Sequence, residues 1–148
     1  MRPRVVLTIL TAGLAVLYAY VLIYVIGIAA SLARPAWWDA VVPTHLLSVR
    51  TWALSCHTAA ILLVSLPFAL VLARLFPRRG VWVALAITVA IYGWLDLPGQ
   101  LEYFGYVSAY MKAVSIIDAM KLVGILPVLV WLIRYLPSNK RLERAGYG

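Results

Sequence analysis

The sequence is poor in charged residues and in the residue types that usually perform catalysis. Only 12% of its 148 residues are charged, five of these are acidic, and it has two histidines and one cysteine. The single cysteine, Cys56, excludes an intrachain disulfide and a CxxC redox pair. Two histidines without paired cysteines supply too few ligands for a structural zinc site. No nucleophile-elbow, phosphate-loop or zinc-protease motif occurs. We therefore predict no catalytic residues, no metal and no cofactor.

Apolar residues fill most of the chain. They make up 65% of it, and the mean hydropathy is +0.96, whereas a soluble domain is about half apolar and about a quarter charged. Four apolar runs can reach the roughly 20 residues that cross a bilayer. We predict an all-α, polytopic membrane protein with one domain over residues 1–148. Its four transmembrane helices are expected at about 5–32, 51–76, 81–97 and 112–136.

The basic residues lie mostly on one side of this layout. The net charge is +8, and lysines and arginines concentrate before the first run, between the second and third, and after the fourth. By the positive-inside rule, this distribution predicts cytoplasmic N- and C-termini in a bacterial-type inner membrane. Residues 33–50 and 98–111 become outer loops, the latter with a short interfacial helix after Pro98 and Gly99, and 138–148 becomes a polar cytoplasmic tail. We expect the basic residues to contact anionic lipid headgroups rather than nucleic acid.

One segment of the sequence occurs twice. Residues 66–77 and 126–137 both begin Leu-Pro, carry an arginine near the end and finish with a proline. A parallel duplication of helices 1–2 as helices 3–4 would explain the match, and so would convergence of two spanning helices on similar residues. In either case Pro67 and Pro127 each remove a helix hydrogen bond, so we predict a kink at both.

Ionisable residues within apolar helices mark a candidate polar site, because they are costly in a bilayer. The 60-residue offset between the repeated segments sets His57 beside Asp118. Asp118 and Lys121 share a helix face and can neutralise each other. They form either a structural ion pair or part of a site open to the outer side, and His57 is either a packing residue or a proton relay. The candidate polar site comprises His57, Asp96, Asp118, Lys121 and Tyr24.

Aromatic residues in the two outer connections mark a candidate interaction surface: Trp37, Trp38, Tyr103, Phe104 and Tyr106. Short connections and the lack of a catalytic motif favour a non-enzymatic interaction or accessory protein, or an immunity or defence-type component. Its expected partners are the lipid bilayer and a second copy or another membrane protein, with no nucleic acid. The alternative is an oligomeric small-solute or ion transporter or channel subunit that uses the polar site. A membrane-embedded enzyme is the third hypothesis.

Overall fold

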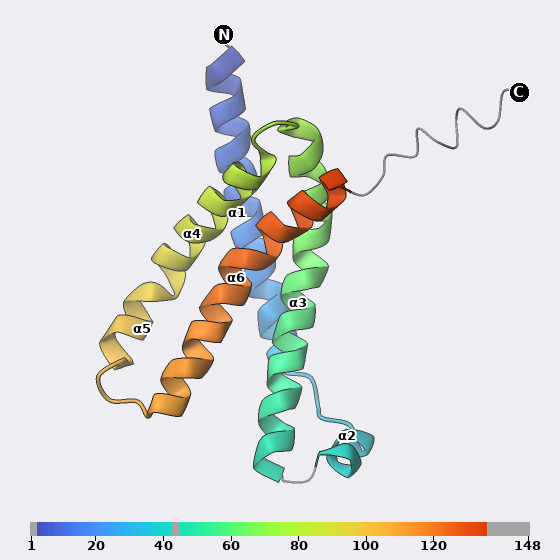
Figure 1. The fold of residues 1–148 in the computed structure, drawn as a ribbon, viewed down its shortest axis with the longest axis vertical. Coiled ribbons are helices and arrows are strands. Elements are labelled where there is room, and N and C mark those ends of the chain that lie inside the picture. The colour runs from blue at the N-terminus through green and yellow to red at the C-terminus, as the bar shows by residue number, and fades with distance from the viewer. Residues whose placement is uncertain (1–2, 43–44, 136–148) are drawn as a thin grey trace, which may run out of the picture. The chain divides into compact units, whose positions relative to one another are not determined.

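The computed structural model describes residues 3–42 and 45–135, and 87% of these residues are helical. No strand occurs within these two ranges, so the predicted all-α class is confirmed. The predicted tail and the terminal proline of the second repeated segment lie outside the described residues. In chain order (Figure 1), the helices are α1 (Pro3–Ala30), α2 (Ala36–Val41), α3 (His45–Leu75), α4 (Gly80–Leu95), α5 (Leu97–Tyr103) and α6 (Ala109–Tyr135).

Three of these helices are long and apolar enough to cross a membrane. They provide the candidate spans Val5–Ala30, Ser48–Leu75 and Ala109–Tyr135. Helix α4 is also apolar but has only 16 residues. At 1.5 Å per residue it is about 24 Å long, against a hydrocarbon core of about 30 Å. The structure thus supports three candidate spans, and the fourth stays a prediction.

Two predicted connections contain more helix than expected. Within the predicted loop 33–50, α2 forms and α3 already begins at His45 rather than at residue 51. Ser48, near the start of α3, is fully buried, and its hydroxyl donates a hydrogen bond to Asp39 of α2, which offsets the cost of burying this polar group. Likewise, α6 begins at Ala109 rather than at residue 112.

The short helix expected in the second connection is present, but it begins earlier than predicted. Helix α4 ends at Leu95, and α5 starts at Leu97 with Pro98 in its first turn. A proline is tolerated there because first-turn N–H groups have no acceptor within the helix. Pro98 therefore opens α5 rather than separating it from the preceding helix.

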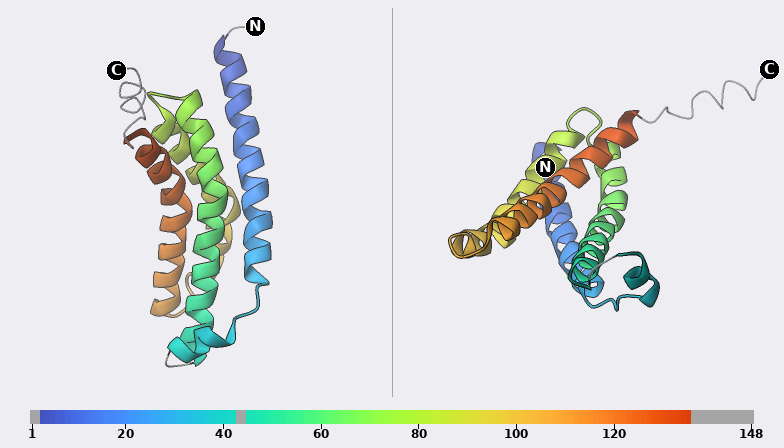
Figure 2. Two further views of the ribbon diagram at one scale, coloured as in Figure 1. Left: turned by 90° about the vertical axis from the view of Figure 1, so that its right-hand side faces the viewer. Right: turned by 60° about the horizontal axis from the view of Figure 1, so that its bottom comes forward.

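The chain divides into two compact units, Met1–Ser65 and Leu66–Gly148, and α3 contributes to both. In the first unit, α1 lies alongside the N-terminal part of α3 (Figure 2). Tyr18 of α1 is buried, and its hydroxyl is hydrogen-bonded to Ser65 Oγ at 2.8 Å. The buried apolar side chains of this unit include Leu22, Ala60, Ile61 and Val64.

In the second unit, α4 and α6 lie side by side (Figure 1). Both helices bury apolar side chains, and close packing must hold helices together in lipid, which supplies no hydrophobic force between them. The apolar residues buried in these two helices are Ala84, Ile87, Ile91, Leu122, Leu126 and Val130.

Gly80 opens α4 at a point where the backbone has no room for a side chain. A Cβ atom there would lie 3.1 Å from Val130 Cγ1 and 3.2 Å from the Leu72 carbonyl oxygen. We expect Gly80→Ala to lower the free energy of unfolding by about 1 kcal/mol, since the overpacking exceeds the gain in helix propensity. Gly93→Ala in the same helix is the matched control, because a Cβ at Gly93 meets nothing within 4 Å. Unfolding in mixed detergent micelles should separate the two variants, and equal stabilities would contradict the close contact at Gly80.

Candidate functional site

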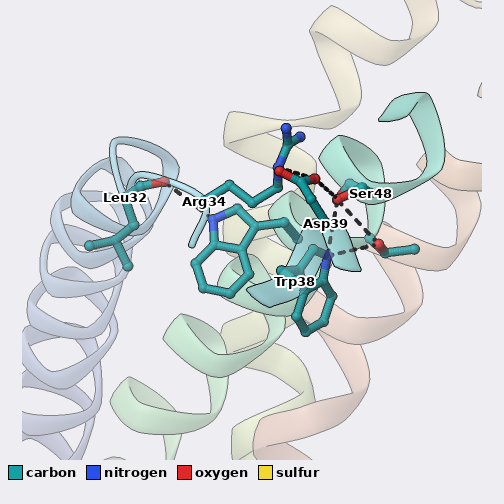
Figure 3. Close-up of polar contacts among 7 residues, drawn as sticks. Leu32, Arg34, Trp38, Asp39 and Ser48 are labelled. Carbon is teal, nitrogen blue, oxygen red and sulfur yellow. Dashed lines mark hydrogen bonds and ion pairs between the residues drawn. The ribbon is translucent and has the colours of Figure 1, made fainter. Parts of the chain in front are cut away.

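Helix α2 is held against the start of α3 by contacts of the partly exposed Asp39 carboxylate. Asp39 Oδ1 accepts a hydrogen bond from Ser48 Oγ at 2.5 Å and an ion-pair contact from Arg34 Nε at 2.8 Å (Figure 3). Hydrogen bonds to charged groups are about twice as strong as those between neutral groups. Asp39 therefore joins the end of the α1–α2 connection to the first turns of α3.

Two tryptophans complete this arrangement (Figure 3). Trp38 Nε1 donates to the Ser48 carbonyl oxygen at 3.1 Å and to Thr51 Oγ1 at 3.3 Å. Trp52 Nε1 donates to the Leu32 carbonyl oxygen at 3.2 Å. The two indole rings meet edge to face, 5.3 Å apart. The Trp38 bonds join α2 to the first turns of α3, and the Trp52 bond joins α3 to the residues that follow α1, which indicates a structural role for Trp38.

The predicted interaction surface is thus divided among different environments. Trp37 is 61% exposed and touches Trp38 by its edge. Tyr106, in the α5–α6 connection, is 92% exposed. Phe104 is partly covered, with Lys112 Nζ 5.0 Å from its ring centroid. Tyr103 ends α5, and its side chain lies outside the described residues.

Two residues of the predicted polar site, Asp118 and Lys121, are in close contact. Lys121 Nζ lies 2.5 Å from Asp118 Oδ1, one turn apart on α6, with 17% and 31% of the respective side chains exposed. The two residues therefore form an ion pair within one helix. Opposite charges at this spacing offset each other's cost in an apolar surrounding.

The other members of the polar site are spread over both units. Asp96 lies between α4 and α5 in the second unit, together with Asp118 and Lys121. Tyr24 on α1 and His57 on α3 belong to the first unit, where Tyr24 is exposed and His57 is half-buried. The gathering of all five residues in one site stays a prediction.

Helix α5 and the adjoining parts of α4 and α6 line two open cavities. We call the first, of about 320 Å³, the polar cavity; it is lined by Leu95, Asp96, Gly99, Gln100, Phe104, Val107 and Ser115. The second, of about 310 Å³, is the apolar cavity, lined by Tyr92, Leu97, Gln100, Leu101, Phe104, Ile116, Ala119 and Met120. Gln100 and Phe104 belong to both.

Gln100 was missed by sequence reasoning, although it is the chain's only glutamine. The Tyr92 hydroxyl donates to Gln100 Oε1 at 3.1 Å across the α4–α5 junction. A side-chain amide has one carbonyl acceptor and two N–H donors. Because the carbonyl oxygen takes the Tyr92 proton, the amide NH2 group of Gln100 is the end that can serve a ligand.

Thr88 was also missed, and it answers the hydrogen-bonding problem that Pro127 creates. Proline has no N–H, so the carbonyl four residues earlier, that of Val123, loses its helical donor. Thr88 is buried on α4, and its Oγ1 lies 2.9 Å from the Val123 carbonyl oxygen on α6. The sequence signal was a hydroxyl residue in an apolar helix. Helices α3 and α6 both continue through their prolines, and the kinks stay a prediction.

No protein-family model matches the sequence, and neither a curated protein nor a solved structure shows significant similarity to it. The class of the protein therefore follows from its own helices. These apolar helices are compatible with a small integral membrane protein.

Proposed function

We propose that this protein is a non-enzymatic component of a cell membrane and acts by binding another membrane protein through an aromatic surface beside α5. We assign to this surface four exposed residues in or near α5 along the chain: Trp94, Leu101, Tyr106 and Tyr110. The observation that carries the proposal is Tyr106, whose side chain is 92% exposed in a connection of only a few residues. Tyrosine and tryptophan are enriched at protein interfaces because they combine a large apolar area with a hydrogen-bonding group.

The polar residues support this choice over transport. Lys121 and Asp118 meet within α6, as expected for a pair that offsets its own charge. The small connections leave little chain for a separate catalytic or binding domain. A pairwise contact made inside the membrane, or at its surface, is therefore the interaction that these helices best support.

If the partner binds through this aromatic surface, Tyr106 should contribute strongly to the affinity. Changing Tyr106 to alanine should reduce recovery of the partner from native membranes by about tenfold or more, because a central interface aromatic contributes about 2 kcal/mol. Purification in mild detergent with quantitative mass spectrometry measures this recovery. Tyr20→Ala on α1 is the matched control, since Tyr20 is also strongly exposed (72%) but lies in the first unit. Equal losses for both variants, or purification of the chain alone, would count against the proposal.

We further propose that α4 is the fourth membrane span, with both termini in the cytoplasm of a bacterial-type cell. A short span is accommodated by local thinning of the bilayer or by flanking interfacial residues. The basic residues Arg74, Arg78 and Arg79 near the α3–α4 link support a cytoplasmic position for that link.

Cysteine labelling in intact cells tests this topology. With Cys56 replaced by serine, a cysteine introduced at Arg78 should be protected from an impermeant maleimide, and one introduced at Gly105 should be labelled. The two positions flank α4 and α5, so they lie on opposite sides only if the segment between them crosses the membrane. Labelling of both positions, or of neither before lysis, would remove α4 from the set of spans.

A further inference from the structure

The polar and apolar cavities adjoin at Gln100 and Phe104, which line both of them. Each cavity has a volume of just over 300 Å³, at the lower end of the range for small-ligand sites. A single ligand that fills both must therefore have a polar part next to a hydrocarbon part. This requirement already points to an amphiphile rather than to a free ion or a small sugar.

The polar cavity presents an acceptor and donors at different points of its wall. Asp96 supplies a carboxylate, which can accept about four hydrogen bonds. The Gln100 amide supplies N–H donors, because its carbonyl oxygen is held by the Tyr92 hydroxyl. Ser115, one turn before Asp118 on α6, adds a hydroxyl. A ligand bound here needs both a cationic donor and an acceptor group.

A positive charge stands beside the same cavity. Lys112 Nζ lies 5.0 Å from the centroid of the Phe104 ring, and Phe104 lines both cavities. The site therefore combines a negative charge at Asp96 with a positive charge near Phe104. Charge complementarity then favours a ligand headgroup that carries both signs.

The apolar cavity supplies the matching hydrocarbon surface. Its wall is formed by Leu97 and Leu101 of α5 and by Ile116, Ala119 and Met120 of α6. Such a surface next to a charged cavity suits the first carbons of an acyl chain that leaves a headgroup. A water-soluble zwitterion of the same charge would leave this wall uncovered.

We propose that the two cavities together bind one zwitterionic phospholipid with a primary ammonium headgroup, that is, a phosphatidylethanolamine. The ammonium binds at Asp96, and the phosphate oxygens accept hydrogen bonds from Gln100 and Ser115. A primary ammonium fits better than a quaternary one, because it donates three hydrogen bonds to a carboxylate environment and a choline group donates none. The choline group's usual aromatic partner, Phe104, already faces Lys112. Lipid binding here does not require the partner protein proposed above, although Leu101 belongs to both surfaces.

Native mass spectrometry of the full chain in detergent tests the proposal. Phosphatidylethanolamine, phosphatidylcholine and phosphatidylglycerol with identical acyl chains are added separately, and the bound fraction is measured. We expect phosphatidylethanolamine to bind at least about fivefold more tightly than the other two. Asp96→Asn should abolish this preference. Glu102→Gln, which removes a neighbouring exposed carboxylate that lines neither cavity, should retain it.

A second measurement distinguishes binding of the whole lipid from binding of its headgroup alone. Glycerophosphoethanolamine, which lacks acyl chains, should compete at least about a hundredfold more weakly than the intact lipid. Equal binding of all three lipids by the wild-type chain would overturn the proposal, and so would equal competition by the soluble headgroup. Loss of the preference in Glu102→Gln as well as in Asp96→Asn would also overturn it. If Asp96→Asn does not fold, the comparison of lipids on the wild-type chain still decides.

Discussion

Replacing Thr88 with valine should lower the free energy of unfolding by about 2 kcal/mol, since an unsatisfied carbonyl within a bilayer is costly. Valine has nearly the same shape as threonine, so the change removes the hydroxyl and little else. The Val123 carbonyl would then lack both its helical donor, which Pro127 cannot supply, and the Thr88 hydroxyl 2.9 Å away. Thr88→Ser should retain most of the stability, because serine keeps the donor.

The prediction is tested by measuring the effect of Thr88→Val in a chain that also carries Pro127→Ala. Alanine restores an N–H at residue 127, which can donate to the Val123 carbonyl in the usual helical pattern. In that background Thr88→Val should cost only about 0.6 kcal/mol, the average for a hydrogen bond between membrane helices. The double-mutant cycle should therefore show a coupling of roughly 1–1.5 kcal/mol between the two positions.

Unfolding of the four proteins in mixed detergent micelles, followed by tryptophan fluorescence, measures this cycle. Thr88 Oγ1 also lies 3.1 Å from the carbonyl oxygens of Ala84 and Leu85 in its own helix. A hydroxyl has one proton to donate, so those contacts compete with the one to Val123. Thr88→Val could lower the free energy of unfolding equally with proline or alanine at residue 127. The hydroxyl would then donate within its own helix, and the proposed hydrogen bond between α4 and α6 would be wrong.

Helix type and the main apolar segments could be predicted from the sequence because they depend on local composition. Runs of about 20 apolar residues specify helices in a membrane whatever surrounds them. The contact between Asp118 and Lys121 was predictable for the same reason, since both residues lie on one helix and spacing alone brings them together. These features need no knowledge of which helices are neighbours.

Contacts between elements could not be predicted in this way. Ser48 was placed in a predicted loop because it is polar. Its position inside α3 is explained only by the hydrogen bond that it donates to Asp39 on α2. Thr88 gains its role from a carbonyl 35 positions further along the chain. The two cavities beside α5 likewise depend on how three helices meet. Each feature requires the packing of separate segments, which periodicity does not encode.

Changing Lys121 to methionine should lower the free energy of unfolding by about 3 kcal/mol, the cost of an uncompensated charge in a membrane helix. The carboxylate of Asp118 would lose the ammonium that now lies 2.5 Å away. Asp118→Asn should be similarly harmful, because it leaves the Lys121 ammonium without its counter-charge. Both single variants therefore break a compensated pair and keep one charged member.

The double variant Asp118→Leu, Lys121→Met should recover most of this loss, because it removes both charges together. Replacing a paired set of charges with well-packed apolar residues is often neutral or stabilising. We expect its stability in mixed micelles to lie within about 1 kcal/mol of the wild type. Leucine and methionine are also close in size to the residues they replace, so they preserve the packing of this part of α6.

The same double variant distinguishes a structural ion pair from a transport site. For a structural pair, the variant should fold, recover the membrane partner at the wild-type level and behave like the wild type in liposome flux assays. For a site that binds a solute or an ion, it should fold equally well but lose flux that the wild-type protein supports. A stable double variant without the wild-type flux would therefore reject the structural role of Asp118 and Lys121, and the interaction function would give way to transport.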